Sequence, residues 1–218
     1  MMGKFTRGAC ALAALSLLAA CGNDRSQQSA SPLGILGQVA SQAIAERNAE
    51  PAAAPRSPSD IAAEALSVNP GPLILVGLES MGTTQAMAMT GQNGDMRTYM
   101  TPNEQALILR NGMLSGTRGL GNDLSVAEAA QSAALIRAGR SGQAQRTMRY
   151  YTGDGLERPL PMTCTIGPGP NAGVMVESCE GLGASFQNNY MVSGGQITVS
   201  RQWIGPALGY VTIQTLRP

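Results

Sequence analysis

The segment that decides the fold is Thr84–Thr117, which reads TQAMAMTGQNGDMRTYMTPNEQALILRNGMLSGT. It holds two Asn-Gly pairs, Asn93-Gly94 and Asn111-Gly112, each between runs of residues that suit strands. Asn-Gly is the preferred pair in two-residue hairpin turns, because both turn positions then tolerate positive φ. The segment therefore predicts two antiparallel hairpins, which together with residues 72–79 form a meander of about five strands.

The same pattern of runs and turns continues to the C-terminus, where glycine-rich signals separate six further runs. After Gly194-Gly195, the residues Ile197, Val199, Arg201 and Trp203 alternate with polar residues, which predicts a strand with two unlike faces. The predicted strands are 72–79, 84–92, 95–101, 105–110, 113–117, 143–152, 156–166, 173–179, 184–192, 196–204 and 208–216.

One helix is predicted within this β-rich region. Ser125-Val126-Ala127-Glu128 has the form of a capping box, and the alanine-rich stretch after it favours helix as far as Arg137. A sheet with this many strands must curl or close to protect its edges. We therefore expect a mainly β fold, an antiparallel barrel or half-barrel with one inserted helix.

The N-terminus has the features of a bacterial lipoprotein signal. Residues 1–20 contain Lys4 and Arg7, then an apolar run too short for a permanent membrane span, and they end in Leu18-Ala19-Ala20 before Cys21. We predict cleavage after residue 20 and lipidation of the Cys21 thiol, a covalent lipid being the one added group expected. Gly22, rather than an aspartate, follows Cys21. By the sorting rule of enteric-type lipoproteins, this residue favours transport onward to the outer membrane. The alternative is a cleaved secretory signal in which the cysteine is incidental.

Residues 21–70 are predicted to be the lipid anchor and an Ala/Pro-rich tether, and residues 71–218 the β-rich domain. Segments 22–28 and 49–58 are too poor in apolar residues to fold alone. Two short helices are expected in the tether. One begins at Ser31-Pro32, and the other spans Ser57–Leu66, with Pro58 at its start and Asn69-Pro70 after it.

Composition excludes several classes of function. The chain has no histidine. Lys4 is its only lysine, so removal of residues 1–20 would leave 15 − 2 = 13 cations, all arginine, against 14 acids. A nearly neutral chain without a basic patch lacks the footprint of a nucleic-acid-binding protein. Catalysis by Ser-His-Asp, Cys-His or Ser-Lys groups is also excluded. Two carboxylates acting on a glycoside stay open, with the candidates Asp95, Glu104, Asp123, Asp154, Glu157 and Glu177.

Cys164 and Cys179 lie on two arms that can pair as a hairpin around a Gly/Pro-rich loop. Exported proteins form disulfides, whereas a metal or redox site would need a Cys-x-x-Cys motif or nearby histidines. We predict a structural disulfide between them, no metal site and no cofactor.

Four residues are candidates for a binding surface. Arg118 and Asp123 lie in a glycine-rich loop that lacks both nucleotide-binding motifs, so a local ion pair is the simpler interpretation. Trp203 beside Arg201 has the composition of a sugar-stacking platform, although a lone tryptophan in a strand more often packs in the core.

The lipobox, the phrase Thr117–Leu124 (TRGLGNDL) and the closing Ser200–Pro206 (SRQWIGP) with Gly209-Tyr210 resemble the YjbF/GfcB lipoprotein family. The resemblance covers about residues 72–218. It implies an outer-membrane lipoprotein encoded with exopolysaccharide or group-four capsule secretion machinery, with a barrel-like periplasmic domain. It implies no enzymatic activity and no catalytic residues.

We therefore expect a non-enzymatic accessory factor for polysaccharide export or assembly, held at the periplasmic face of the outer membrane. Its partners would be export proteins or the polysaccharide. A carrier with an apolar cavity for lipid, inside a half-barrel, is the alternative from another class. A glycosidase is the third, and it needs two carboxylates that face each other across a cleft.

Overall fold

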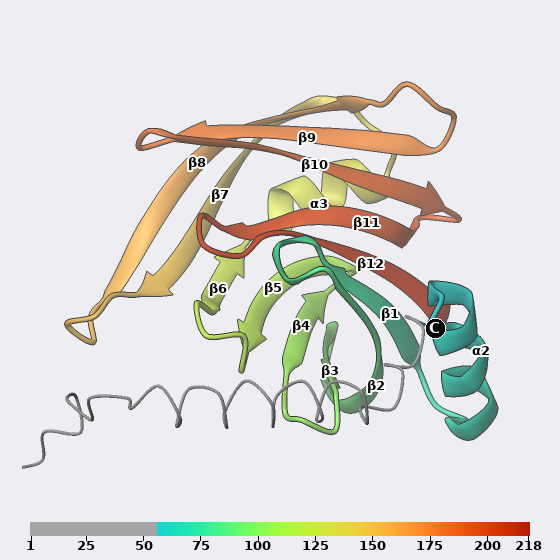
Figure 1. The fold of residues 1–218 in the computed structure, drawn as a ribbon. Helices are drawn as coiled ribbons and strands as arrows, with labels where there is room; N and C mark the ends of the chain where they lie inside the picture. The colour runs from blue at the N-terminus through green and yellow to red at the C-terminus, as the bar shows by residue number, and fades with distance from the viewer. Residues whose placement is uncertain (1–55) are drawn as a thin grey trace, which may run out of the picture. The chain divides into compact units, whose positions relative to one another are not determined.

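A computed structural model describes residues 56–218 of the chain (Figure 1). The predictions for residues 1–55, which include the signal, Cys21 and the helix at Ser31-Pro32, lie outside these described residues. The described elements are α2 (Pro58–Val68), β1 (Leu73–Leu78), a 3-10 turn (Glu79–Met81), β2 (Thr83–Asn93), β3 (Met96–Met100), β4 (Ala106–Arg110), β5 (Met113–Arg118), β6 (Leu124–Glu128), α3 (Ala130–Arg137), β7 (Gly142–Tyr151), β8 (Glu157–Pro168), β9 (Val174–Gly181), β10 (Ala184–Ser193), β11 (Gln196–Gly205) and β12 (Gly209–Arg217).

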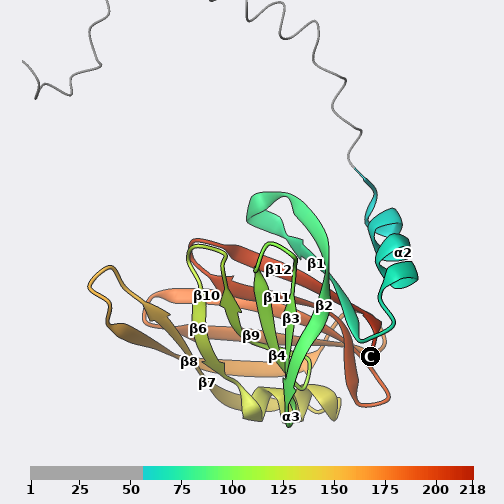
Figure 2. The same ribbon diagram turned by 90° about the horizontal axis from the view of Figure 1, so that it is seen from below.

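The strands form one antiparallel sheet in the order β5-β4-β3-β2-β1-β12-β11-β10-β9-β8-β7-β6. Every neighbouring pair except β1 and β12 is also consecutive in the sequence, so the sheet is two meanders joined where the first strand meets the last. The sheet curls until its edge strands, β5 and β6, approach each other, which gives a nearly closed barrel (Figures 1 and 2). The predicted fold class is confirmed.

Methionine fills much of the interior in place of aromatic side chains. Met87, Met148 and Met162 are at most 1% exposed and lie among inward-facing Leu, Ile and Val side chains. Unbranched, flexible methionine side chains adapt to irregular gaps, which suits a chain with only 4% aromatic residues.

The helix α2 lies outside the sheet, beside β1, β2 and β12 (Figure 2). It forms as predicted, because Ser57 caps its N-terminus through the Asp60 N–H and Asn69 ends it. The guanidinium of Arg217, on β12, donates to the carbonyls of Asn69 and Leu66 at the C-terminal end of the helix. These bonds fix α2 to the last strand.

The predicted helix over Ser125–Arg137 is wrong in its first part. Residues Leu124–Glu128 form the edge strand β6, paired with β7, and helix α3 begins only at Ala130. The Ser125 hydroxyl donates to Glu157 rather than capping a helix. Pairing with β7 provides the backbone of this segment with partners that outweigh its local helix preference. α3 then packs against β7–β10, with Ala133 and Ile136 in the core.

The two Asn-Gly turns differ. Asn111 and Gly112 have φ of 52° and 83° between the paired residues Arg110 and Met113, as predicted. Asn93, by contrast, is still paired with Met96, so the two turn residues there are Gly94 and Asp95. The predicted turn is therefore displaced by one residue, and the glycine occupies the first turn position, as in a type II′ hairpin.

The predicted alternation in β11 is interrupted by a bulge. Met191 pairs with Val199 but the adjacent Val192 pairs with Ile197, which leaves Thr198 as the extra residue. A bulge reverses the faces of the residues beyond it. Consequently Ser200 and Gln202, rather than Val199 and Arg201, turn into the barrel.

The β7–β8 hairpin extends beyond its neighbours (Figure 1). β8 pairs with β7 over Glu157–Ile166 but with β9 only from Thr163 onward. The stretch 157–162 therefore has a strand on one side only, and it contains Pro159 and Pro161.

Candidate functional site

Arg118 and Asp123 lie where the barrel closes, and they do not form the predicted pair: none of the ion pairs within residues 56–218 joins them. The Arg118 guanidinium instead donates to the carbonyls of Leu124 (3.2 Å) and Ser125 (3.3 Å). Asp123 accepts from the Thr117 hydroxyl at 2.7 Å, and that hydroxyl accepts the Leu124 N–H at 2.9 Å.

These bonds replace a backbone ladder, because no regular pairing connects β5 to β6 in the described sheet. Side chains at the end of β5 satisfy backbone groups of β6. The glycine-rich phrase Thr117–Leu124 thus closes the barrel, and its two charged residues have structural roles.

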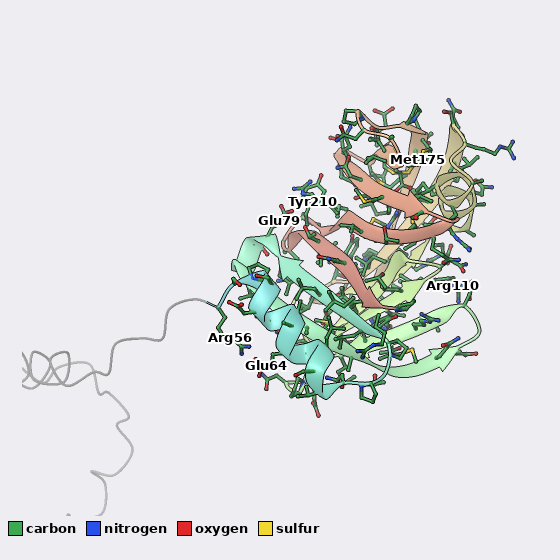
Figure 3. All side chains as sticks on the ribbon, turned by 90° about the vertical axis from the view of Figure 1, so that its right-hand side faces the viewer. Arg56, Glu64, Glu79, Arg110, Met175 and Tyr210 are labelled. Atoms are coloured by element: carbon green, nitrogen blue, oxygen red, sulfur yellow. A yellow bond between two sulfur atoms is a disulfide. The ribbon has the colours of Figure 1, made fainter. Side chains whose placement is uncertain are left out.

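Arg201 and Trp203 do not form an exposed stacking platform. Trp203 is 8% exposed and stacks on Phe186 with ring centroids 4.7 Å apart. Arg201 lies over the Tyr210 ring, 3.5 Å from its centroid, and donates two hydrogen bonds of 2.6 and 2.7 Å to the Glu79 carboxylate. The two residues that it joins, Glu79 and Tyr210, are labelled next to each other in Figure 3. The hydrogen bond from Arg201 lowers the pKa of Glu79. All groups of this cluster are engaged with one another.

Cys164 and Cys179 form the predicted disulfide, directly opposite each other on β8 and β9 and facing the interior. Closing a loop of this size contributes about 3 kcal/mol through chain entropy. The Glu177 carboxylate lies within 4.8 Å of both sulfurs, but disulfide sulfurs are not thiolate ligands, so this group does not form a metal site.

A buried polar cluster lies in the interior of the barrel. Arg146 on β7 and Glu177 on β9 form an ion pair of 3.0 Å with both side chains fully buried. Asn188 and Tyr190, both on β10, donate to the same carboxylate oxygen at 2.9 and 2.8 Å. Asn188 also accepts the backbone N–H of Trp203 at 2.7 Å. The cluster joins β7, β9, β10 and β11.

The electrostatics of the cluster follow from its burial. Burial by itself raises the pKa of Glu177, but the charge of Arg146 and the donated hydrogen bonds outweigh it and keep the pKa below its ordinary value. Burial also raises the pKa of Tyr190 well above its ordinary value. The pair is thus ionised near neutral pH, and the tyrosine keeps its proton.

Several polar atoms in this cluster have no partner within the described residues: Arg146 Nε and Nη2, Glu177 Oε1 and the Ser132 hydroxyl of α3. Unsatisfied buried groups cost free energy of folding, so stability alone does not explain this cluster. Arg146 was not among the residues predicted from the sequence. The signal that could have identified it is its place in phase with the inward-facing Ala144 and Met148, in a strand that alternates between buried and exposed positions.

A cleft of about 630 Å³ opens at one end of the barrel. It lies among the β2–β3, β4–β5 and β10–β11 turns and the end of β12. Its floor is apolar and includes Ile74, Leu109 and Ile197, while amide and hydroxyl side chains surround it. Its volume lies in the range of small-molecule sites, whereas its lining is more polar than is usual for them.

The cleft and the buried cluster are physically connected. The Gln202 amide, on β11, donates to the carbonyl of Gly112 in the cleft wall at 3.2 Å. The Tyr190 hydroxyl lies 3.5 Å from Gln202 Oε1 and 2.8 Å from Glu177. Interior polar groups thus hold the turn that forms one wall of the cleft.

A family model described as "Group 4 capsule polysaccharide lipoprotein gfcB, YjbF" matches residues 46–216. The chain belongs to the YjbF family. The predicted resemblance is thereby confirmed, and it places the chain in a family of lipoproteins associated by name with capsule polysaccharide. No curated protein matches the sequence.

Among solved structures, the YjbF-family chain is similar to the crystal structure of the hypothetical lipoprotein YmcC from Escherichia coli (K12). The TM-score is 0.59 at 18% identity, covering 89% of this chain and 98% of that one. At this identity the likeness shows the fold alone. In the described part of the chain, no helix has both the length and the hydropathy that a membrane span requires.

Proposed function

We propose that this protein is a non-enzymatic accessory factor in the export or assembly of an extracellular polysaccharide, anchored by a lipid on Cys21 to the periplasmic face of the outer membrane. The observation that carries the proposal is the family match over residues 46–216, whose description joins a lipoprotein to capsule polysaccharide. The lipobox ending at Cys21 supports the anchor. Its partners are polysaccharide-export proteins or the polysaccharide itself.

The surroundings of the acidic residues favour a binding role over glycoside hydrolysis. Glu177 is fully buried in its ion pair, Glu157 accepts from Ser125, and Asp154 accepts from Arg158. Asp95 accepts from Asn111 at 2.8 Å and lies 3.5 Å from Arg110. A hydrolase needs one protonated and one ionised carboxyl that can reach the substrate. These carboxylates are committed to structural partners instead.

The packed interior argues against the alternative of a lipid carrier. Inward-facing side chains from all parts of the sheet meet in one core. An apolar cavity in the barrel would also have to accommodate the buried charges of Arg146 and Glu177. A lipid chain would gain little in such a polar environment.

The experiment is deletion of the gene followed by complementation in cells that make the polysaccharide. We expect deletion to lower surface polysaccharide, and the wild-type gene to restore it. Cys21→Ser should fail to restore it and should lose incorporation of labelled palmitate, whereas Cys10→Ser, a matched loss of a thiol within the signal, should restore both. Unchanged polysaccharide after deletion, or full rescue by Cys21→Ser, would contradict the proposal.

A further inference from the structure

We propose that the cleft at the barrel end binds a carboxylate-bearing saccharide, with Arg97 as the residue that receives the carboxylate. This inference deepens the proposed function and rests on it for the choice of a saccharide. The cleft itself is a feature of the fold.

Arg97 points into the barrel mouth. In β3 it lies opposite Leu109 of β4 and two positions before Tyr99, both of which are buried in the core. Residues opposite each other, or two apart along a strand, share a face of the sheet. Arg97 therefore lies on the inner face, at the level where the cleft opens, and it lines the cleft.

The guanidinium of Arg97 is available for a ligand. Across residues 56–218, the ion pairs of arginine involve Arg56, Arg110, Arg146, Arg149, Arg158 and Arg201, and Arg97 belongs to none of them. Asp95, the acidic side chain beside it in the cleft, is already engaged by Asn111 and Arg110. A partly buried arginine without a carboxylate partner is suited to bind one from a ligand in a bidentate manner.

The rest of the lining favours a saccharide over a phosphate or a lipid. Ser193, Gln196 and Thr215 line the cleft, and the hydrogen bonds within residues 56–218 do not engage their side chains. Neutral hydroxyl and amide groups match the hydroxyls of a sugar, and the apolar floor matches its C–H faces. A phosphate site would gather several cations or backbone N–H groups.

The test is calorimetric titration of the mature lipoprotein, purified in detergent, with trigalacturonate and with the neutral trisaccharide maltotriose. We expect trigalacturonate to bind and maltotriose to bind at least about tenfold more weakly, because only the first supplies a carboxylate to Arg97. Absence of trigalacturonate binding, or equal affinity for the two sugars, would overturn the proposal.

Two variants locate the site. Arg97→Gln should weaken trigalacturonate binding by about 10- to 100-fold, and Gln196→Ala, at an exposed position that leaves the fold intact, should weaken it by a smaller factor. Arg158→Gln is the matched control and should bind as the wild type does. Wild-type affinity in Arg97→Gln would refute the role of Arg97, and wild-type affinity in both Arg97→Gln and Gln196→Ala would also refute the cleft as the site.

Deletion and titration together separate this inference from the proposed function. If the deletion strain loses polysaccharide but titration shows no binding of trigalacturonate that depends on Arg97, the cleft proposal fails while the accessory role stands. If deletion itself has no effect, the accessory role fails. Binding of trigalacturonate that depends on Arg97 would then still support the cleft.

Discussion

The side-chain amide of Gln202 crosses the barrel interior to the far strand β5, where its Oε1 accepts the backbone N–H of Leu114 at 2.8 Å. Its Nε2 donates to the carbonyl of Gly112 and to the Ser200 hydroxyl. β11 and β5 are six places apart in the sheet order, so this bond joins parts of the sheet that have no ladder between them.

Replacement of Gln202 tests the importance of this bond. Gln202→Leu keeps a side chain of similar volume but leaves the buried Leu114 N–H unsatisfied, so we expect a loss of about 1–3 kcal/mol in the free energy of unfolding. Urea unfolding measures it. Gln187→Leu, an exposed glutamine on β10, is the control and should change stability little. Equal stability of the two variants would show that the cross-barrel bond contributes nothing.

The buried ion pair should respond differently to single and double substitution. Glu177→Gln leaves the Arg146 charge uncompensated in the interior, and we expect a loss of about 3–5 kcal/mol. Arg146→Met combined with Glu177→Leu removes both charges and should be much less destabilising. Equilibrium unfolding in urea compares the three proteins. A double variant as unstable as Glu177→Gln would mean that polar bonds to the cluster, rather than charge pairing, dominate.

The same pair predicts how stability depends on pH. Because the pKa of Glu177 is lower in the folded protein than its ordinary value of 4.5, the folded state favours the ionised form. Its contribution is complete above that ordinary value and is lost as pH falls through the lowered folded-state pKa. Thermal unfolding from about pH 7 down to about pH 3 should show this loss in the wild type and a smaller one in Glu177→Gln. Parallel curves would contradict the assignment.

The junction between β5 and β6, where the barrel closes, should loosen when Arg118 is replaced. Arg118→Ala loses the bonds to the Leu124 and Ser125 carbonyls, and we expect a loss of about 1 kcal/mol with faster amide hydrogen exchange in residues 113–118 and 124–128. Arg149→Ala, which removes a surface ion pair to Glu128 on β6, is the matched control and should leave exchange in β5 unchanged. Hydrogen-exchange mass spectrometry measures this difference. Exchange in residues 113–118 that is as slow in Arg118→Ala as in Arg149→Ala would contradict the prediction.

Gly112 lies where the cleft wall meets β11. A Cβ at this position would come within 2.8 Å of Ile197 Cβ, in addition to the strain of φ at 83°. Gly94→Ala has a comparable positive φ of 59° but open space around it. We expect Gly112→Ala to be more destabilising than Gly94→Ala by about 1–3 kcal/mol in urea unfolding. A smaller difference would mean that Ile197 can move aside freely.

Much of this fold could be predicted because its signals are local. Turn residues and alternation located most strands, and Ser57-Pro58 together with Asn69-Pro70 located α2. β6 was missed because its pairing with β7 is decided by distant residues, whereas its own sequence, Ser125-Val126-Ala127-Glu128, favours a helix. Local preference is a weak guide where tertiary contacts decide.

The candidate site was harder to predict, since it depends on which residues meet across the barrel. The disulfide could be predicted from the expected export of the protein and from the positions of the two cysteines on the arms of a predicted hairpin. The roles of Arg118, Arg201 and Trp203 were not, because the carbonyls, carboxylate and ring that they contact lie on other strands. No motif in the sequence around Arg97 indicates a site. Its importance comes from the strand register, which places it in the cleft.

Residues 157–162 of β8 pair with β7 but not with β9, and this open strand edge affects how neighbouring copies of the protein can interact. An exposed strand edge is a template on which another chain can add a strand. The ladder with β7 is intact opposite Pro159 and Pro161, so the nitrogens that lack a proton face the open side. If the proposed lipid anchor holds several copies close together, this arrangement opposes strand addition between the hairpins of neighbouring copies.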